Sequence, residues 1–320
     1  CTLCPWKGWV AMSRLALFLL GSPRIELDEV PVRIERRKSV ALLAYLAMTG
    51  EGHSRDTLAT LLWPELDQSR ARAGLRYALA TLKKSLGDGW LDVDRERVGL
   101  NPNLAPAPSE DRPVSEPELW LDAAEFRARL AQCRTHGHPE GQVCPDCLAP
   151  LAGAAELYRD DFLAGFTLRD SPTFDEWQFF QTESLRQELA SVLERLVQGH
   201  SAQGAHEAAI PYARRWLALD PLHEPAHRQL MRLYAVAGQR AAALRQYGEC
   251  ERLLLEELDV PPDENLFTSG LIDSVGAMRL VSHMESSLGV KIPPGDLVPE
   301  NFHTVEVMAK FLKGLDGSAE

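Results

Sequence analysis

The stretch SRDTLATLLWPELDQSRARAGLRYALATLKKSLG, residues 54–87, decides the fold of the first part of the chain. Within it, the segment from Ser69 to Leu86 carries five basic residues and no acidic one. These are Arg70, Arg72, Arg76, Lys83 and Lys84. Leucines recur at helical spacing at positions 75, 79, 82 and 86, which predicts a helix with one buried stripe. Arg76 and Lys83 then lie on its outer surface, with Arg72 at the edge of the stripe.

A helix with these residues fits the major groove of DNA, where arginine side chains grip phosphates or guanine edges. For an isolated helix, a solvated cationic surface is the simpler interpretation. The surrounding segments favour DNA. Two helical patterns, Lys38–Met48 and Ser54–Leu62, precede the basic helix, and three strand-like pieces precede those: Ala16–Leu20, Arg24–Leu27 and Val32–Ile34. Residues Trp90–Leu100 alternate like a hairpin, with Arg95 and Arg97 near its tip. This order predicts a winged helix-turn-helix.

The composition changes after residue 101. Residues 102–117 hold five prolines and little apolar content, which indicates a linker. From Leu119 to about Leu258 the pattern is almost entirely helical. Gly204 and Gly238 are 34 residues apart, and the pair Ala208-Ala209 recurs at the same offset. A 34-residue helix–turn–helix period is typical of tetratricopeptide (TPR) repeats, although chance similarity between alanine-rich helices would also produce it.

These residues resemble a known family. RKSVALLAYLAMTG (37–50), SRDTLATLLWPELD (54–67) and ARAGLRYALATLKKSLG (71–87) resemble the OmpR-type DNA-binding domain of the antibiotic regulatory protein (SARP) family of bacterial activators. LDPLHEPAHRQLMRLYAVAGQRAAALRQY (219–247) is similar to that family's bacterial transcriptional activator domain. The resemblance covers about Leu15 to Pro262. It implies a sequence-specific DNA-binding regulator whose helical domain aids dimerisation or contacts RNA polymerase. No G-x-x-x-x-G-K-[ST] loop is present, so we expect no ATP binding through a P-loop.

A cysteine and histidine cluster forms the second candidate site. Cys133, His136, His138, Cys144 and Cys147 follow the spacing C-x2-H-x-H-x5-C-x2-C, which suits tetrahedral zinc. We expect Cys133, His136, Cys144 and Cys147 as ligands, with His138 as the alternative histidine. The site would be structural and would clamp a loop between the first two helices of the activator domain. A surface loop with unremarkable thiols and a redox C-x-x-C remain alternatives at this point. Cys250 is expected to be a buried core thiol.

The third candidate site lies near the C-terminal end. LFTSGLIDSVGAMRLVSHMESSLGVKIPPGDLVPENFHTVEVMAKFL (266–312) resembles an acyl or peptidyl carrier protein. The resemblance implies that Ser274, preceded by Asp273, receives 4'-phosphopantetheine from coenzyme A through a phosphopantetheinyl transferase. A serine at a helix N-terminus can hold a phosphodiester, but the same serine would also serve as an ordinary helix cap.

The carrier resemblance lacks a separate first helix. The segment ECERLLLEELDV (249–260) could serve as that helix, but it also fits the end of the activator domain. One helix cannot bury the same leucines in two cores, so the two domains would compete for it. The sequence indicates a junction between two genes, which either a natural fusion or an assembly error would produce.

The predicted fold class is mainly α: a winged helix-turn-helix, a TPR-like helical repeat domain and a partial four-helix carrier bundle. The predicted bounds are 12–101, a linker at 102–117, 118–262 and 263–320, with residues 246–259 shared. Met12 is the expected natural start, and Cys1–Val10 should add nothing to the fold. No apolar run approaches the roughly 20 residues that span a bilayer, so we expect a cytoplasmic chain without membrane contact.

The net charge of −12 does not exclude DNA as a partner. The segment 12–101 has 14 Lys and Arg against 12 Asp and Glu, whereas residues 264–320 have 4 against 8. The leading hypothesis is therefore a non-enzymatic DNA-binding regulator with a carrier-like tail. The alternatives are a biosynthetic carrier protein with a helical interaction scaffold, and a repeat-type protein-binding module with vestigial DNA contact.

Overall fold

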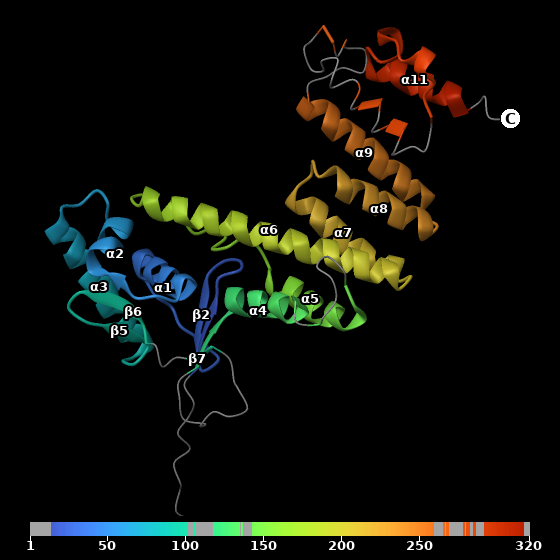
Figure 1. Cartoon of the computed structure of the whole chain (residues 1–320). Coiled ribbons are helices and arrows are strands. Elements are labelled where there is room, and N and C mark those ends of the chain that lie inside the picture. The colour runs from blue at the N-terminus through green and yellow to red at the C-terminus, as the bar shows by residue number, and fades with distance from the viewer. Residues whose placement is uncertain are drawn as a thin grey trace, which may run out of the picture. The chain divides into compact units, whose positions relative to one another are not determined.

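The structure is a computed structural model that describes residues 14–101, 105–106, 118–134, 136, 143–258, 265, 267–268, 278, 280–281, 284–285 and 291–316. The chain divides into two compact units, Cys1–Leu219 and Asp220–Glu320, and each is described by itself. The mainly helical fold class is confirmed (Figure 1).

The first unit begins with a hairpin of β1 (Arg14–Phe18) and β2 (Arg24–Leu27), extended by β3 (Val30–Pro31). The sequence predicts the third strand at Val32–Ile34, which is wrong. The chain turns earlier because Asp28 and Glu29 take left-handed backbone angles, with φ of 51° and 65°. This two-residue turn pairs Leu27 with Val30 and fixes the register of the strands.

Three helices and a small sheet follow in the predicted order. They are α1 (Arg37–Thr49), β4 (His53–Ser54), α2 (Arg55–Leu62), α3 (Gln68–Leu86), β5 (Leu91–Val93) and β6 (Arg97–Leu100). The sheet order is β4-β6-β5, so the β5–β6 hairpin pairs with the short strand between α1 and α2. Leucines of α1, α2 and α3 form the common core, as the leucine stripe of α3 predicts.

The structure also differs from the predicted secondary structure at residues 118–121. The sequence predicts helix from Leu119, but β8 (Glu118–Leu121) is a strand that pairs in parallel with β1, placing Leu119 opposite Leu15. β7 (Ala105–Pro106) adjoins it, so the larger sheet has the order β3-β2-β1-β8-β7. A strand from beyond the proline-rich segment therefore completes the sheet that the first residues begin.

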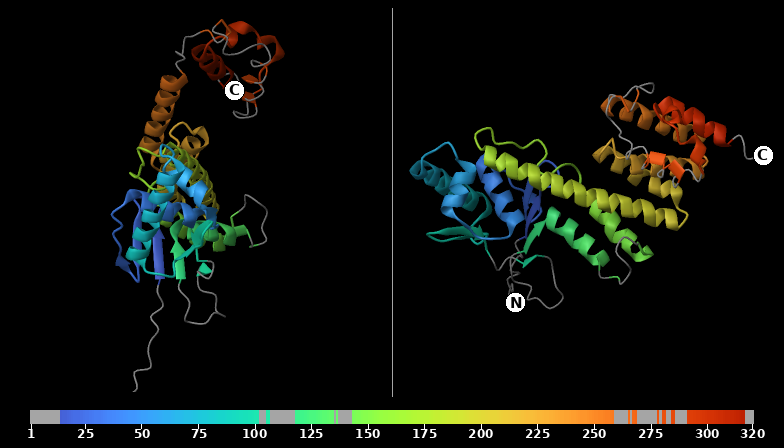
Figure 2. Two further views of the ribbon diagram at one scale, coloured as in Figure 1. Left: turned by 90° about the vertical axis from the view of Figure 1, so that its left-hand side faces the viewer. Right: turned by 45° about the horizontal axis from the view of Figure 1, so that its top comes forward.

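The remaining helices of the first unit are α4 (Asp122–Arg134), α5 (Pro145–Leu157), α6 (Pro172–Ala202) and α7 (His206–Leu219). The long α6 packs against α2 near its start and against α5 and α7 further along. The right-hand view of Figure 2 shows it as one long helix. It thus connects the winged-helix part with the helical part.

The second unit contains α8 (Glu224–Val236), α9 (Arg240–Leu258), the short η1 (Pro294–Asp296) and η2 (Pro299–Asn301), and α11 (Val305–Asp316). A small core of Val281, Met284, Ile292, Phe302 and Met308 lies in its last part. Cys250 is buried in α9, as predicted. Among the helices that the structure describes, none combines the length and apolar character needed to cross a bilayer.

The 34-residue offset has a structural counterpart. Gly204 and Gly238 have φ of 72° and 75°, a left-handed conformation that glycine adopts without strain. Each lies in a helix-ending turn closed by the same bond one residue later: Ala205 N–H donates to His200 O at 2.9 Å, and Gln239 N–H donates to Tyr234 O at 2.7 Å. The two helix–turn–helix segments share this local geometry, while their assignment as TPR repeats stays a prediction.

Candidate nucleic-acid interface and metal site

Helix α3 starts at a capped end and buries one face. The Asp67 side chain accepts a hydrogen bond from the Arg70 N–H at 3.1 Å, which satisfies a backbone donor that would otherwise lack a helical partner. Leu75, Leu79 and Leu82 are buried against the other helices. All five predicted basic residues are exposed. The structure therefore presents these cations to solvent, as the sequence predicts.

Three of the five cations of α3 already have carboxylate partners. Arg72 donates to both oxygens of Asp56 in α2, at 2.6 and 2.7 Å, and this hydrogen bonding lowers the pKa of the Asp56 carboxyl. Arg70 lies 3.3 Å from Asp67, and Lys83 lies 3.8 Å from Asp88. These side chains are held by the domain's own acids, which the sequence analysis did not foresee.

Arg76 and Lys84 differ from the other three. Both are exposed, and among the described residues neither has an ion-pair or hydrogen-bond partner. Arg76 and Lys84 can therefore bind a new anion without first breaking an internal ion pair. Tyr77, next to Arg76, is 55% exposed on the same helix.

The wing separates its two arginines. Arg95 is exposed at the turn of the hairpin and has no partner among the described residues. Arg97 instead points back into the domain, where its guanidinium donates to Gly52 O. Asp94 shapes the turn by accepting from the N–H groups of Arg97 and Glu96, both at 2.6 Å, and these bonds lower the pKa of its carboxyl. Of the two predicted wing contacts, Arg95 is the available one.

The cysteine and histidine residues of the second candidate site come together. His136 Nδ1 lies 3.1 Å from Cys147 Sγ and 3.4 Å from Cys144 Sγ, and the two sulfurs are 3.4 Å apart. Cys144 precedes α5 and Cys147 lies in its first turn, whereas His136 follows α4. All three ligand atoms lie within 4.8 Å of one another.

The fourth expected ligand, Cys133, is buried at the end of α4. Its thiol faces the Arg129 and Cys147 carbonyl oxygens at 3.7 and 3.8 Å and lies close enough to the Cys147 thiol to affect its ionisation. It borders the three-residue group without belonging to it. His138 lies outside the described residues.

The chemistry of this donor set fits a tetrahedral metal ion. Zinc bound at about 2.3 Å from sulfur and about 2.0–2.1 Å from nitrogen separates its ligand atoms by roughly 3.5–3.8 Å, close to the observed spacing. The cysteines are free thiols rather than a disulfide. Burial, together with the neighbouring Cys144 and Cys133 thiols, raises the pKa of Cys147 to about 12. Without a cation nearby, the Cys147 thiol therefore stays protonated at neutral pH.

Asp122 has a structural role that the sequence does not reveal. Its carboxylate is 1% exposed and accepts from the N–H groups of Leu19 and Leu20, both at 2.9 Å, and of Ala123 at 2.8 Å. Burial raises its pKa. The residue pins the start of α4 to the chain just beyond β1. An aspartate at the start of a helix normally indicates a helix cap. The sequence therefore gives no signal for the hydrogen bonds of Asp122 to Leu19 and Leu20, about a hundred residues earlier.

The predicted phosphopantetheine attachment site, Asp273 and Ser274, lies outside the described residues. The described part of this region supplies only the small core around Phe302 and the start of α11, where Thr304 caps the helix by accepting from Val307 N–H at 3.1 Å.

Comparison with family models assigns residues 121–312 of the chain to two families. Residues 121–269 match the family described as bacterial transcriptional activator domain, and residues 250–312 match the phosphopantetheine attachment site. The two matches overlap at 250–269, which includes the C-terminal half of α9. Both family matches therefore include part of α9, the helix that the sequence predicts to be shared by two domains.

Individual relatives agree with this division. The transcriptional regulatory protein EmbR of Mycobacterium tuberculosis is 28% identical over 261 residues, 79% of this chain and 61% of EmbR. The chain thus spans less than two thirds of that relative's length. The D-alanyl carrier protein of Streptococcus pyogenes is 30% identical over 66 residues, 21% of this chain and 80% of the carrier. The structure of EmbR with a low-affinity phosphopeptide has a TM-score of 0.55 at 22% identity, covering 78% of this chain and 62% of EmbR, which shows a shared fold.

Proposed function

We propose that the chain, a bacterial transcriptional activator of the SARP type with a C-terminal phosphopantetheine-attachment segment, is a sequence-specific DNA-binding regulator that acts in the cytoplasm. Its role is regulatory rather than catalytic. The observation that carries the proposal is the exposure of Arg76 and Lys84 on α3, which have no partner among the described residues.

In this mechanism α3 enters the major groove and the β5–β6 hairpin lies on the adjacent backbone. Arg76 and Lys84 contact DNA directly, while Arg95 at the hairpin tip contacts a phosphate. Arg70, Arg72, Lys83 and Arg97 are predicted contacts that must first exchange an internal partner. They contribute less per residue, because the lost ion pair or hydrogen bond offsets the gain. The helical repeat domain is proposed to contact RNA polymerase or a second copy of the chain.

A selection from random DNA duplexes tests this function. The full chain should enrich duplexes that share one sequence, and should bind that sequence roughly 10³-fold more tightly than scrambled DNA. A shared sequence lost in the Arg76→Ala variant supports direct readout by α3. Enrichment of no sequence by a folded sample would contradict the regulator.

Structural zinc at Cys144, Cys147 and His136, with Cys133 as the fourth ligand, is part of the proposal. The support is the close approach of three ligand atoms from segments on either side of the loop between α4 and α5. Zinc would hold those helix ends together. Elemental analysis of the purified chain should find one zinc ion per chain, and the Cys144→Ser/Cys147→Ser variant should lose it. The Cys250→Ser variant, which removes a buried thiol elsewhere, is the control.

The C-terminal segment is proposed to accept 4'-phosphopantetheine on Ser274, next to Asp273, from a phosphopantetheinyl transferase. The family match at 250–312 and the similarity to a D-alanyl carrier protein support this. Incubation of the full chain with coenzyme A and a promiscuous transferase should add the mass of one phosphopantetheine group. The gain should disappear in Ser274→Ala, and no gain in a folded wild-type sample would contradict the assignment.

A further inference from the structure

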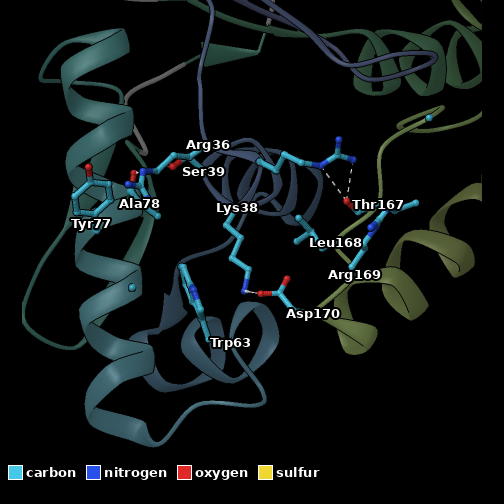
Figure 3. Close-up of a pocket in the computed structure, with 13 residues that line it drawn as sticks. Arg36, Lys38, Ser39, Trp63, Tyr77, Ala78, Thr167, Leu168, Arg169 and Asp170 are labelled. Atoms are coloured by element: carbon cyan, nitrogen blue, oxygen red, sulfur yellow. Dashed lines mark hydrogen bonds and ion pairs between the residues drawn. The ribbon is translucent and has the colours of Figure 1, made fainter.

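A cavity of about 650 Å³ lies where the winged-helix part meets the loop before α6. Its walls come from the start of α1, from Trp63 at the end of α2, from Tyr77 on α3, and from residues 165–170. In Figure 3, Tyr77 and Arg36 lie on one side of the space and Thr167, Arg169 and Asp170 on the other, with Lys38 between them. Its volume lies within the range typical of small-molecule sites. All of its walls belong to the first unit of the chain.

The cavity carries an excess of positive charge. Its thirteen lining residues include four cations and a single carboxylate, that of Asp170. The cations are Arg36, Arg37, Lys38 and Arg169. Asp170 forms an ion pair with Lys38, whose Nζ lies 2.8 Å from the Asp170 Oδ2 (Figure 3). The remaining three guanidinium groups have no lining carboxylate to neutralise them.

The contacts of these arginines leave their charge uncompensated. Arg37 donates to Thr167 O at 3.1 and 2.8 Å, so its partner is a neutral carbonyl. The Arg36 guanidinium lies 3.8 Å from the centre of the Tyr77 ring. Arg169 is exposed and has no partner among the described residues. Guanidinium groups of this kind match phosphate oxygens with two parallel N–H donors.

The start of α1 adds to the positive potential. Arg36 occupies the N-cap position with no side-chain cap bond, and the first turn has no acidic residue. The partial positive charge of the helix end therefore faces the same space as the guanidinium groups, where an anion would be stabilised.

From this cavity we infer a binding site for a small phosphate-bearing anion. The ligand would lie between Arg36, Arg169 and the start of α1. It would tie α1 to the 165–170 loop, which already meets the winged-helix part through Arg37 and Lys38. Binding would thereby stabilise one arrangement of the winged helix relative to the helices that follow.

Isothermal titration of the full chain with inorganic pyrophosphate tests the inference, with sodium chloride used to keep ionic strength constant. The wild type should bind saturably with one site per chain. Arg36→Gln/Arg169→Gln should weaken binding by roughly tenfold or more, because two charge-assisted contacts are lost. Arg232→Gln removes an exposed arginine of α8 that has no partner among the described residues, and it should bind like the wild type.

Absence of saturable binding to the folded wild type would overturn the site, as would equal affinity of the double variant. If the double variant does not fold, Arg169→Gln alone removes an exposed side chain and serves in its place. DNA is the competing occupant. A loss of DNA affinity in the double variant as large as that in Arg76→Ala, without pyrophosphate present, would identify the cavity as a DNA-backbone contact and overturn the small-anion assignment.

Discussion

Arg72 of α3 donates two hydrogen bonds, of 2.6 and 2.7 Å, to the carboxylate of Asp56 in α2. This cation of the basic helix therefore already has a partner within the domain and would have to release it to contact DNA. The pKa of Asp56 is lowered chiefly by this bond, so the carboxylate stays ionised and the pair stays intact at neutral pH. Both side chains are about half exposed. The pair therefore orients the helix more than it stabilises the fold.

Asp56→Asn should strengthen DNA binding. The substitution removes one negative charge from the DNA-facing side and releases Arg72 to contact a phosphate. We expect higher affinity at low salt, and a slope of log K against log salt that is steeper by about 0.9. Fluorescence anisotropy on one duplex measures both, with Glu207→Gln, which removes an exposed acid of α7 away from the proposed DNA contacts, as a matched control. A weaker affinity for Asp56→Asn would show instead that the ion pair is needed to position α3.

Asp122→Ala should destabilise the first unit. The carboxylate is buried and accepts from the N–H groups of Leu19 and Leu20, which would be left without acceptors. Unsatisfied buried donors cost about 1–3 kcal/mol each, so we expect these two to lower the unfolding free energy by about 2–6 kcal/mol. Urea denaturation followed by circular dichroism measures it. Asp146→Ala, an exposed acid in the first turn of α5, is the control. Unchanged stability in Asp122→Ala would contradict the pinning role.

The same residue gives a pH dependence with a defined sign. Burial raises the pKa of Asp122 in the folded chain, so the folded state holds this proton more tightly than the unfolded state does. Its contribution to stability is then present below the ordinary aspartate pKa and is lost as pH rises through the raised folded pKa. Asp122→Asn, which cannot ionise, should lack this loss. The test compares unfolding free energies of wild type and Asp122→Asn across mildly acidic pH, and parallel curves would contradict the shift.

Removal of metal should loosen the ends of α4 and α5. Structural zinc contributes folding free energy directly, so a chelator should lower the unfolding temperature of the wild type. Cys144→Ser/Cys147→Ser should already unfold at the lower temperature and should not respond to the chelator. Differential scanning calorimetry distinguishes the two. An equal response to chelator in both proteins would place the bound metal elsewhere.

Local patterns in the sequence predicted much of the fold. The leucine stripe placed α3 within one residue of its observed start, because helix periodicity depends on neighbours along the chain. The 34-residue offset located Gly204 and Gly238, which close equivalent turns. The sequence did not predict strand β8, because four residues are too few to show a clear alternation of apolar and polar side chains. In addition, its partner β1 lies about a hundred residues earlier in the chain.

The candidate site was predicted as residue types rather than as contacts. Ligand spacing was enough to bring His136, Cys144 and Cys147 together, since all three lie on one loop and its flanking helices. Whether a cation is free depends on tertiary neighbours: Arg72 meets Asp56 sixteen residues away, and Arg97 turns toward Gly52. Sequence alone could not separate these from Arg76 and Lys84.

Salt dependence of DNA binding tests the central claim most directly. Anisotropy titrations of the full chain on a selected duplex should give a log K that falls linearly with log salt. Arg76→Ala/Lys84→Ala should flatten that slope by about 1.8, because two positive charges that displace counterions from the DNA are lost. Arg232→Ala should leave the slope unchanged. Wild-type binding that does not respond to salt, or a double variant with the wild-type slope, would contradict DNA recognition by α3.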